Sequence, residues 1–207
     1  LGTAGSVKNA EAFLDDTFLV ISGDALTDIN LSDAVSFHKK KNAAATLVLS
    51  RVKNPLDYGI VVTDQNGRVM QFLEKPKWSE VFSDTANTGI YIMEPYVLNL
   101  FRQGENVDFG KDIFPLMLER GEKLSGYVSD GYWCDIGDID TYLKCHYDVL
   151  DKKIDIAMSS YEVGNHMWIS ETSIISPNAQ VSSPVYIADG VRIADNVKIE
   201  PYSVICE

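Results

Sequence analysis

Two aspartates stand directly after apolar segments of the sequence, where strands are expected to end. Asp24 follows the segment 18–22 behind Gly23, and Asp135 lies within the segment 133–137. Ligands of open α/β sheets bind at the carboxyl ends of the strands. A pair of carboxylates there suits Mg²⁺ held mainly by substrate phosphates, because this ion takes only one or two protein carboxylates and keeps much of its hydration. We therefore expect Asp24 and Asp135 to be metal ligands with a catalytic role.

Each aspartate also has a purely structural interpretation. Turns favour aspartate in any protein, so Asp24 taken alone is equally consistent with a solvated turn. For Asp135 the alternative is a helix cap, although Asp138 and Asp140 are better placed for that position. The argument for a metal site therefore rests on the pair.

The tripeptide Glu74-Lys75-Pro76 follows the expected strand 68–72. Lys75 offers a point charge for a phosphate group, Glu74 offers an acceptor for hydroxyl groups, and Pro76 fixes the backbone. The alternative is an exposed ion pair at a strand end, which is common. We expect Glu74 to contact substrate and Lys75 to act on a phosphate.

Three further segments combine glycine with polar or aromatic side chains. Tyr58-Gly59 and Asn87-Thr88-Gly89 each begin an expected strand, and Leu1-Gly2-Thr3-Ala4-Gly5 opens the chain. Glycine allows a ligand to approach the backbone closely, but each segment alone more often only forms a turn. We interpret the opening segment as a working loop of a longer protein, because the chain does not begin with Met and the segment lacks the regions of a signal peptide.

Apolar runs alternate with helical patterns as far as Leu150. Helices are expected from a cap at Asn30 or Ser32 to Lys41, at 95–101, at 111–120, and from Asp138 or Asp140 to Leu150. Strands are expected at 17–22, 45–50, 58–63, 68–72, 89–93 and 123–128. The turn Asn66-Gly67 predicts a hairpin between the third and fourth of these strands. This order predicts an α/β fold with a mixed, mostly parallel sheet and flanking helices.

Composition excludes several classes of partner. The net charge is -12, from 18 Lys and Arg against 30 Asp and Glu, so no basic surface for nucleic acid or an anionic membrane is expected. Hydrophobic residues make up 45% of the chain, but no apolar run is long enough to span a bilayer. The three cysteines form no C-x-x-C pair and indicate reduced thiols, which predicts a cytoplasmic protein.

The last part of the chain carries a repeat. Aliphatic residues recur at every sixth position, at Ile169, Ile175, Val181, Ile187, Ile193, Ile199 and Ile205. This period is the signature of a parallel β-helix, and the alternative is chance spacing in a Val/Ile-rich β-sandwich. Seven short repeats are too few for a solenoid that stands alone. We therefore predict a larger domain at 1–151, a linker at 152–165 and a hexapeptide-repeat segment at 166–207.

The order of these motifs resembles that of the sugar-1-phosphate nucleotidyltransferases, also called nucleotide-sugar pyrophosphorylases. The similar segments are Leu1 to Gly5, Ser22-Gly23-Asp24, Tyr58-Gly59, Phe72 to Pro76, Asn87 to Tyr91 and Trp133 to Gly137. The resemblance extends to about Leu150, and branches of this family carry a left-handed β-helix behind the catalytic domain. The segment around Asp135 and the short linker look most like mannose-1-phosphate guanylyltransferases.

The resemblance implies a Rossmann-like domain that converts a nucleoside triphosphate and a sugar 1-phosphate into a nucleoside diphosphate sugar and pyrophosphate. GTP and mannose 1-phosphate are the expected substrates, with thymidine or uridine nucleotides and glucose as the alternative. By position, Gly2, Thr3 and Ala4 match the loop that meets the base, and Asp24 and Asp135 match the Mg²⁺ ligands. Tyr58, Gly59, Glu74 and Asn87 match positions that contact the sugar, and Lys75 matches the lysine at the sugar phosphate.

The sequence departs from the family in one respect. The family's glycine-rich, arginine-containing loop, which holds the triphosphate, has no counterpart from Leu1 onward. We therefore expect this chain alone to be inactive. We also expect it to self-associate through an uncovered sheet edge and through the end of the repeat at Ile205. Two other classes are considered. The first is a regulatory subunit that binds nucleotide sugar without turnover, and the retained aspartate pair argues against it. The second is a hexapeptide acyltransferase, and the repeat argues against it because it is short and has no histidine from Ile169 onward.

Overall fold

The computed structural model describes residues 1–81 and 83–206, which form two compact units. The first unit comprises Leu1–Ala25 and Ile29–Trp133, and the second comprises Leu26–Asp28 and the chain from Cys134 onward. Helix α4 (Ile139–Leu150) belongs by its contacts to the second unit. The domain boundaries predicted at residues 151 and 165 stay predictions, and Glu207 at the end of the predicted repeat lies outside the described residues.

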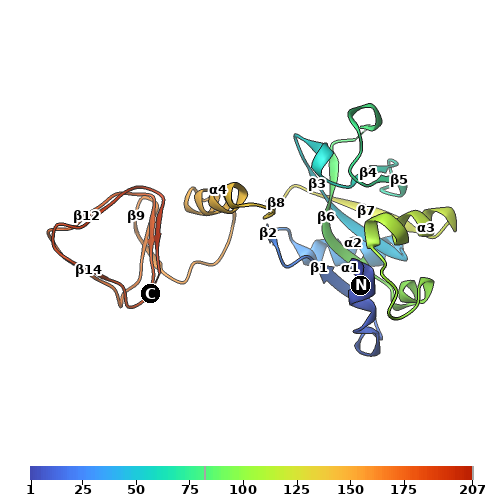
Figure 1. The fold of residues 1–207 in the computed structure, drawn as a ribbon, viewed down its shortest axis with the longest axis horizontal. Coiled ribbons are helices and arrows are strands. Elements are labelled where there is room, and N and C mark those ends of the chain that lie inside the picture. The colour runs from blue at the N-terminus through green and yellow to red at the C-terminus, as the bar shows by residue number, and fades with distance from the viewer. Residues whose placement is uncertain (82, 207) are drawn as a thin grey trace. The chain divides into compact units, whose positions relative to one another are not determined.

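The first unit contains one main sheet with flanking helices (Figure 1). Its strands are β1 (Phe18–Ile21), β3 (Ala45–Arg51), β4 (Ile60–Thr63), β5 (Val69–Leu73), β6 (Thr85–Met93) and β7 (Leu124–Ser129). Its α-helices are α1 (Gly2–Lys8), α2 (Leu31–Lys41) and α3 (Phe114–Glu119). Short 3-10 turns lie at Glu11–Phe13, Pro55–Asp57, Trp78–Glu80 and Pro95–Leu100, and a π-helical turn at Phe109–Ile113 precedes α3.

The sheet is mixed, and the prediction that it is mostly parallel was wrong. The strand order is β5-β4-β6-β3-β7, with β1 also paired to β6. Among the described strands of this sheet, only the β3–β7 pairing is parallel; β6 runs antiparallel to β1, β3 and β4. β1 and β3 therefore flank β6 and run in the same direction, and an apolar run in the sequence does not reveal the reversed strand between them.

Side chains alternate between the two faces of the sheet, and each face has its own core. Leu47, Leu49 and Met93 belong to a cluster with Phe114 and Met117 of α3. Val48, Ile90 and Ile92 belong to a second cluster with Ala34, Leu31 and Val35 around α2. Helices thus cover both faces and fix the strand ends that carry the candidate site.

Strand β1 is less buried than the sequence suggested. An apolar run such as 17–22 is typical of a strand buried on both faces, but Leu19 and Ile21 are 40% and 46% exposed. Among the described strands, β1 pairs with β6 alone, so it lies at an edge of the sheet. An edge position leaves one side of a strand uncovered, which accounts for the exposure.

The structure confirms the predicted hairpin, and for each of two helices it has one of the two predicted residues as the cap. The Asn30 side chain accepts hydrogen bonds from the backbone N–H groups of Ser32 and Asp33 and so begins α2. The Asp138 side chain accepts from Thr141 N at 2.7 Å and begins α4. Strands β4 and β5 form the predicted antiparallel hairpin around Gly67, whose φ is 77°.

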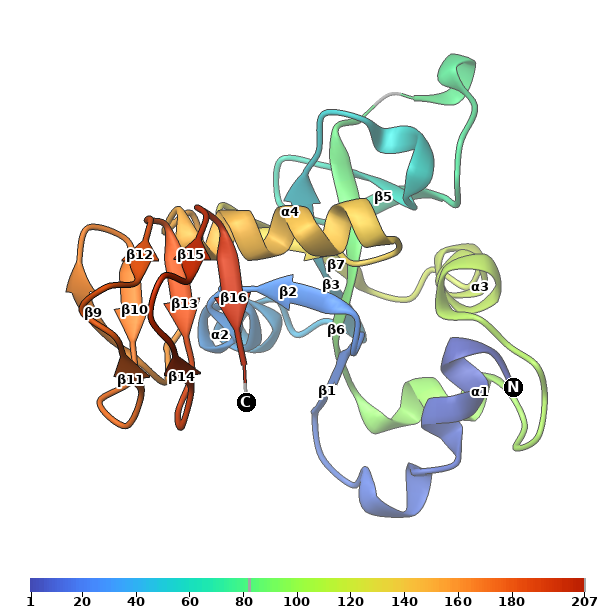
Figure 2. The ribbon, with the colours of Figure 1, turned by 60° about the vertical axis from the view of Figure 1, so that its left-hand side comes forward.

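The second unit contains short strands after α4. They are β9 (Tyr161–Gly164), β10 (Met167–Ile169), β11 (Ile174–Ile175), β12 (Gln180–Val181), β13 (Val185–Ile187), β14 (Arg192–Ile193), β15 (Lys198–Ile199) and β16 (Ser203–Ile205). Figure 2 shows β10, β13 and β16 side by side, and their pairing is parallel. Cα partners are eighteen residues apart, as in Met167 with Val185 and Val185 with Ser203. β2 (Ala25–Thr27) and β8 (Trp133–Asp135) pair with each other in a separate two-stranded sheet.

No helix in the described part of the chain is both long and apolar enough to cross a membrane.

Candidate functional site

The centre of the candidate site is Glu74, the first residue after β5. A Cβ atom added to Gly59 would lie 2.8 Å from the Oε2 atom of Glu74, and one added to Gly110 would lie 2.9 Å from the same atom. Both distances are shorter than real Cβ atoms show, so the two glycines leave the space that this carboxylate occupies. The sequence pointed to Gly59 and Glu74 separately, and the structure brings them together.

Burial and neighbouring charges act on the Glu74 carboxylate. Burial raises its pKa above the ordinary value, and the nearby Asp108 carboxylate raises it further. Lys111 and Lys75 oppose this shift with positive charge. The site therefore combines acidic acceptors with two cations, which suits a ligand that has both hydroxyl groups and a phosphate.

Asn87 joins this group through two hydrogen bonds. Its backbone N–H donates to Gly59 O at 2.7 Å, and its Nδ2 donates to the hydroxyl of Tyr91 at 2.9 Å. Tyr91 is 7% exposed, and burial raises the pKa of its hydroxyl, which stays protonated. The sequence did not single out Tyr91 as a site residue, because an aromatic in a β-strand usually belongs to the core.

Asp108 is a second residue that sequence reasoning missed. Its Oδ1 accepts from the backbone N–H groups of Gly110 at 2.9 Å and Lys111 at 3.1 Å, so it begins the helical turn before α3. Its Oδ2 accepts from the Thr3 hydroxyl at 2.8 Å. A capping aspartate followed by Gly110-Lys111 is a readable helix-start signal. Its position beside Glu74 depends on the fold.

The opening segment is a helix, and its interpretation as a loop was wrong. Helix α1 begins at Gly2, where φ is 68°, and a Cβ there would lie 2.3 Å from Val107 O. Gly5 N donates to Val107 O at 3.1 Å, and Ala4 is fully buried. The small residues thus allow close packing on the segment before Asp108. The roles predicted for Gly2, Thr3 and Ala4 toward a base stay predictions; Thr3 is the one whose side chain contacts Asp108.

Lys75 has an unusual backbone. Its φ is 45°, a left-handed conformation that costs a non-glycine residue about 1 kcal/mol or more. The side chain is exposed. Backbone strain of this kind concentrates at ligand sites, which makes Lys75 a candidate independently of its charge.

Tyr58 has a packing role in the structure. Its ring lies 5.2 Å from that of Trp133 in an edge-on arrangement, and Trp133 Nε1 donates to Thr88 O at 3.1 Å. A direct contact of Tyr58 with substrate stays a prediction.

The predicted metal ligands lie in different units. Asp24 is exposed in the turn after β1, and Asp135 is half-buried at the end of β8. Among the described residues there is no group of three or more His, Cys, Asp and Glu placed to hold a metal. Their chemistry fits Mg²⁺, since that ion takes one or two carboxylates and fills its other positions with phosphate oxygens and water. The metal site itself stays a prediction from the sequence.

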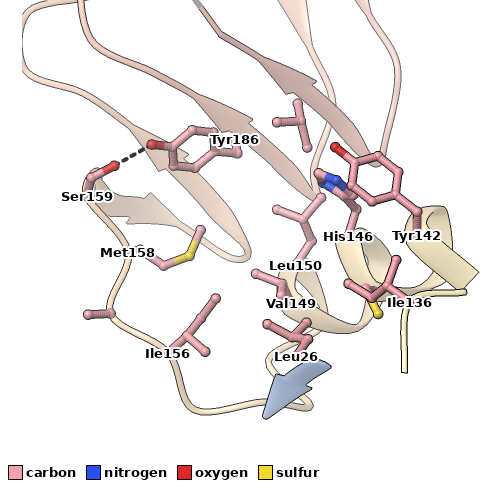
Figure 3. A pocket seen from close by; sticks show the side chains of 13 residues that line it. Leu26, Ile136, Tyr142, His146, Val149, Leu150, Ile156, Met158, Ser159 and Tyr186 are labelled. Carbon is pink, nitrogen blue, oxygen red and sulfur yellow. Dashed lines mark hydrogen bonds between the residues drawn. The ribbon is translucent and has the colours of Figure 1, made fainter. Parts of the chain in front are cut away.

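An apolar cavity of about 350 Å³ in the second unit is a separate feature (Figure 3). It is lined by side chains of α4, of the segment 156–159 and of the strands β13 and β16, including Val149, Ile156 and Met158. No Asp, Glu, Lys or Arg lines it. A concave apolar pocket is the usual starting hypothesis for a small-molecule site. Without a lysine, an arginine or a carboxylate in its lining, however, this cavity does not match the charged phosphates of the expected substrates.

The fold and the cluster at the ends of β5 and β6 define an α/β protein with a polar, charged strand-end site. The family model described as "Nucleotidyl transferase" matches residues 1–152, and the chain belongs to this family.

The relatives of this chain are named for different nucleotide and sugar substrates. The chain is 38% identical over 206 residues to a UTP–glucose-1-phosphate uridylyltransferase of Synechocystis, covering 96% of the chain and 53% of the relative. It is 31% identical over 204 residues to a mannose-1-phosphate guanylyltransferase of Mycobacterium tuberculosis, covering 97% and 55%. It thus spans about half the length of these relatives.

A solved structure supports the fold. The UTP-bound UGPase of Acinetobacter baumannii superposes with a TM-score of 0.62 over 72% of this chain and 56% of that one, at 23% identity. At this identity the likeness shows a shared mixed α/β fold and nothing finer.

Proposed function

We propose that this protein transfers a nucleotidyl group from a nucleoside triphosphate to a sugar 1-phosphate, giving a nucleoside diphosphate sugar and pyrophosphate. The observation that carries the proposal is the Glu74 carboxylate, held in the space left by Gly59 and Gly110 and flanked by Lys75 and Lys111. Membership of the nucleotidyl transferase family supports it.

The chemistry requires positioning more than acid–base catalysis. A phosphate oxygen of the sugar phosphate, already anionic, forms a bond to the α-phosphorus while the bond from that phosphorus to the pyrophosphate oxygen breaks. We assign sugar hydroxyls to Glu74 and Asn87 and the sugar phosphate to Lys75. Each group holds a reactant in place and lowers the entropic part of the barrier. When bound, Mg²⁺ supplies charge neutralisation for the phosphates, with Asp24 and Asp135 as its proposed ligands.

The base and sugar are the finer part of the proposal. The 38% identity to a UTP–glucose-1-phosphate uridylyltransferase supports UTP and glucose 1-phosphate as the first candidate pair. GTP and mannose 1-phosphate, the pair expected from the motif around Asp135, is the second candidate and is supported by the 31% identical guanylyltransferase.

We propose in addition that strands β10 to β16 form the predicted left-handed parallel β-helix of hexapeptide repeats. Parallel pairing at an offset of eighteen residues supports this, because eighteen residues are three hexapeptides. Ile187, Ile193 and Ile199 of the repeat are buried in one cluster. Self-association of the chain stays a prediction.

A substrate panel on the intact protein tests the function. Pyrophosphate release would be measured with UTP, GTP, dTTP and ATP against glucose 1-phosphate and mannose 1-phosphate. We expect the highest kcat/KM for UTP with glucose 1-phosphate. Highest activity for GTP with mannose 1-phosphate would establish the second candidate pair, and no turnover with any pair would contradict the proposed reaction.

A variant pair ties the reaction to the proposed site. Glu74→Ala should raise KM for the sugar phosphate while the exposed Glu119→Ala leaves it unchanged. An equal KM for Glu74→Ala and the wild-type protein would remove Glu74 from the sugar site.

A further inference from the structure

An open, polar pocket of about 480 Å³ lies within the first unit, at the turn of the β4–β5 hairpin. We call it the hairpin pocket. Three cationic side chains line it: Lys41 at the end of α2, Arg68 just before β5, and Lys123 just before β7. The pocket belongs to neither the candidate site nor the predicted metal pair.

The hairpin pocket is lined by more positively than negatively charged residues, although the protein carries a net negative charge. The chain has a net charge of -12, yet three cations from separate elements line this one pocket. Among the described residues, none of the three forms an ion pair with a carboxylate. Lys41 instead lies over the ring of Phe37, at 5.4 Å from its centroid. Three cations in a single pocket give it a positive potential that attracts small anions, although the protein as a whole is acidic.

One carboxylate is present, and its position leaves the pocket cationic. Asp64 also lines the hairpin pocket, and its Oδ1 accepts from the backbone N–H groups of Asn66 at 2.8 Å and Arg68 at 2.9 Å. This carboxylate therefore shapes the turn. With three cations against one carboxylate, the side chains that line the pocket keep an excess of positive charge.

We propose that the hairpin pocket binds a phosphate group, as a small phosphomonoester or free phosphate. The guanidinium of Arg68 matches a phosphate with two parallel hydrogen bonds, and the two lysines add point charges. Ser125, which is 2% exposed, also lines the pocket. A mixed set of fixed donors and flexible ammonium groups is typical of phosphate recognition.

The hairpin pocket is separate from the candidate site although one strand connects them. Arg68 precedes β5, and Glu74 follows it, so the five residues of β5 lie between them. Six residue steps of about 3.3 Å place Arg68 and Glu74 about 20 Å apart, farther than one phosphate can bridge. Failure of this inference would therefore leave the proposed transfer reaction untouched, and the reverse also holds.

Binding can be followed on the chain itself by NMR. We would titrate the ¹⁵N-labelled protein with inorganic phosphate and, separately, with glycerol 3-phosphate, at constant ionic strength set by chloride. We expect saturable shifts of the Gly67, Gly121 and Ser125 amides. Tighter binding of glycerol 3-phosphate would identify an ester site, and equal or tighter binding of inorganic phosphate would identify free phosphate as the ligand.

Variants assign the shifts to the hairpin pocket. Arg68→Gln and Lys123→Gln should each weaken binding by about two- to fivefold, the scale of one exposed charged contact. Lys40→Gln removes the same charge next to Lys41 outside the pocket, and Lys75→Ala removes a cation from the candidate site; both should leave the affinity unchanged. The proposal is overturned if chloride alone reproduces the shifts, if no saturable shift appears, or if Lys123→Gln binds like the wild-type protein.

Discussion

The hydroxyl of Thr3 donates a 2.8 Å hydrogen bond to the Asp108 carboxylate, which lies 105 residues further along the chain. The same hydroxyl oxygen accepts from Phe109 N at 3.0 Å. Thr3 thus ties α1 to the helical turn that places Asp108 beside Glu74. Hydrogen bonds to charged groups contribute more than neutral ones, so this contact holds part of the candidate site in place.

Thr3→Val removes both hydrogen bonds at nearly constant volume. We expect a loss of about 1–2 kcal/mol in the free energy of unfolding, because Asp108 and the N–H of Phe109 lose a partner. Thr3→Ser keeps the hydroxyl and should cost much less. Chemical denaturation of the two variants measures the difference, and equal stabilities would show that the contact contributes nothing.

Gly59→Ala tests the space around Glu74. The added Cβ would lie 2.8 Å from Glu74 Oε2 and 2.9 Å from Phe72 Cζ, so one of these side chains must move. Overpacking of this kind costs about 1–3 kcal/mol, and we expect a raised KM for sugar phosphate with a smaller change in kcat.

Gly164→Ala is the matched control for that substitution. Its nearest neighbour would be Met167 Sδ at 3.8 Å, an ordinary contact distance. A Gly59→Ala protein that matches this control in both stability and KM would show that the glycine is not needed to place the carboxylate.

Sequence reasoning succeeded where a signal is local. Asn30 or Ser32 was predicted to cap one helix and Asp138 or Asp140 another, and the structure has Asn30 and Asp138 as the caps. The Asn66-Gly67 turn defined the β4–β5 hairpin. Glu74 was proposed as a site residue because it follows a strand, and its role there stays a prediction.

Features that depend on contacts between residues far apart in the sequence were not predicted. The direction of β6 relative to β1 and β3 leaves no trace in an apolar run, so the sheet was predicted as mostly parallel. The opening glycines looked like a loop because their packing partner, the backbone at Val107, is distant in sequence. Asp108 was missed because its role depends on the Thr3 contact and on its position near Glu74.

Glu74→Gln should change the pH dependence of stability. The folded state raises the pKa of Glu74 above its ordinary value of 4.5, so the folded protein holds this proton more tightly than the unfolded chain does. Ionising Glu74 therefore costs stability, which falls as the pH rises from about the ordinary value through the folded-state pKa. We expect Glu74→Gln to have a higher Tm than the wild-type protein at neutral pH and a smaller advantage near pH 4.

Thermal unfolding between pH 4 and pH 8 measures this effect, with Glu119→Gln as the control because Glu119 is exposed. A Tm difference for Glu74→Gln that does not vary with pH would mean that the carboxylate is as well solvated as an exposed one.

Ile187→Ala tests the packing of the hexapeptide repeat. Ile187 is fully buried among Val185, Ile193 and Ile199, so the truncation should cost about 2–5 kcal/mol in the second unit. Ile174→Ala removes the same atoms from a side chain that is 57% exposed and should cost much less. Similar destabilisation by both substitutions, measured by denaturation, would contradict an inward-facing row of aliphatic residues.

Asp24→Asn and Asp135→Asn test the predicted metal ligands. Each substitution keeps the size of the side chain and removes its charge, so a lost Mg²⁺ contact should lower kcat in the intact protein at least about a hundredfold. The apparent affinity for Mg²⁺ should fall as well, which a purely structural role of either residue would not produce. Asp15→Asn, at an exposed position before β1, is the control for a general change in charge. If Asp135→Asn reaches full turnover at saturating Mg²⁺, Asp135 is not a ligand, and the same outcome for Asp24→Asn would assign Asp24 to the turn after β1 alone.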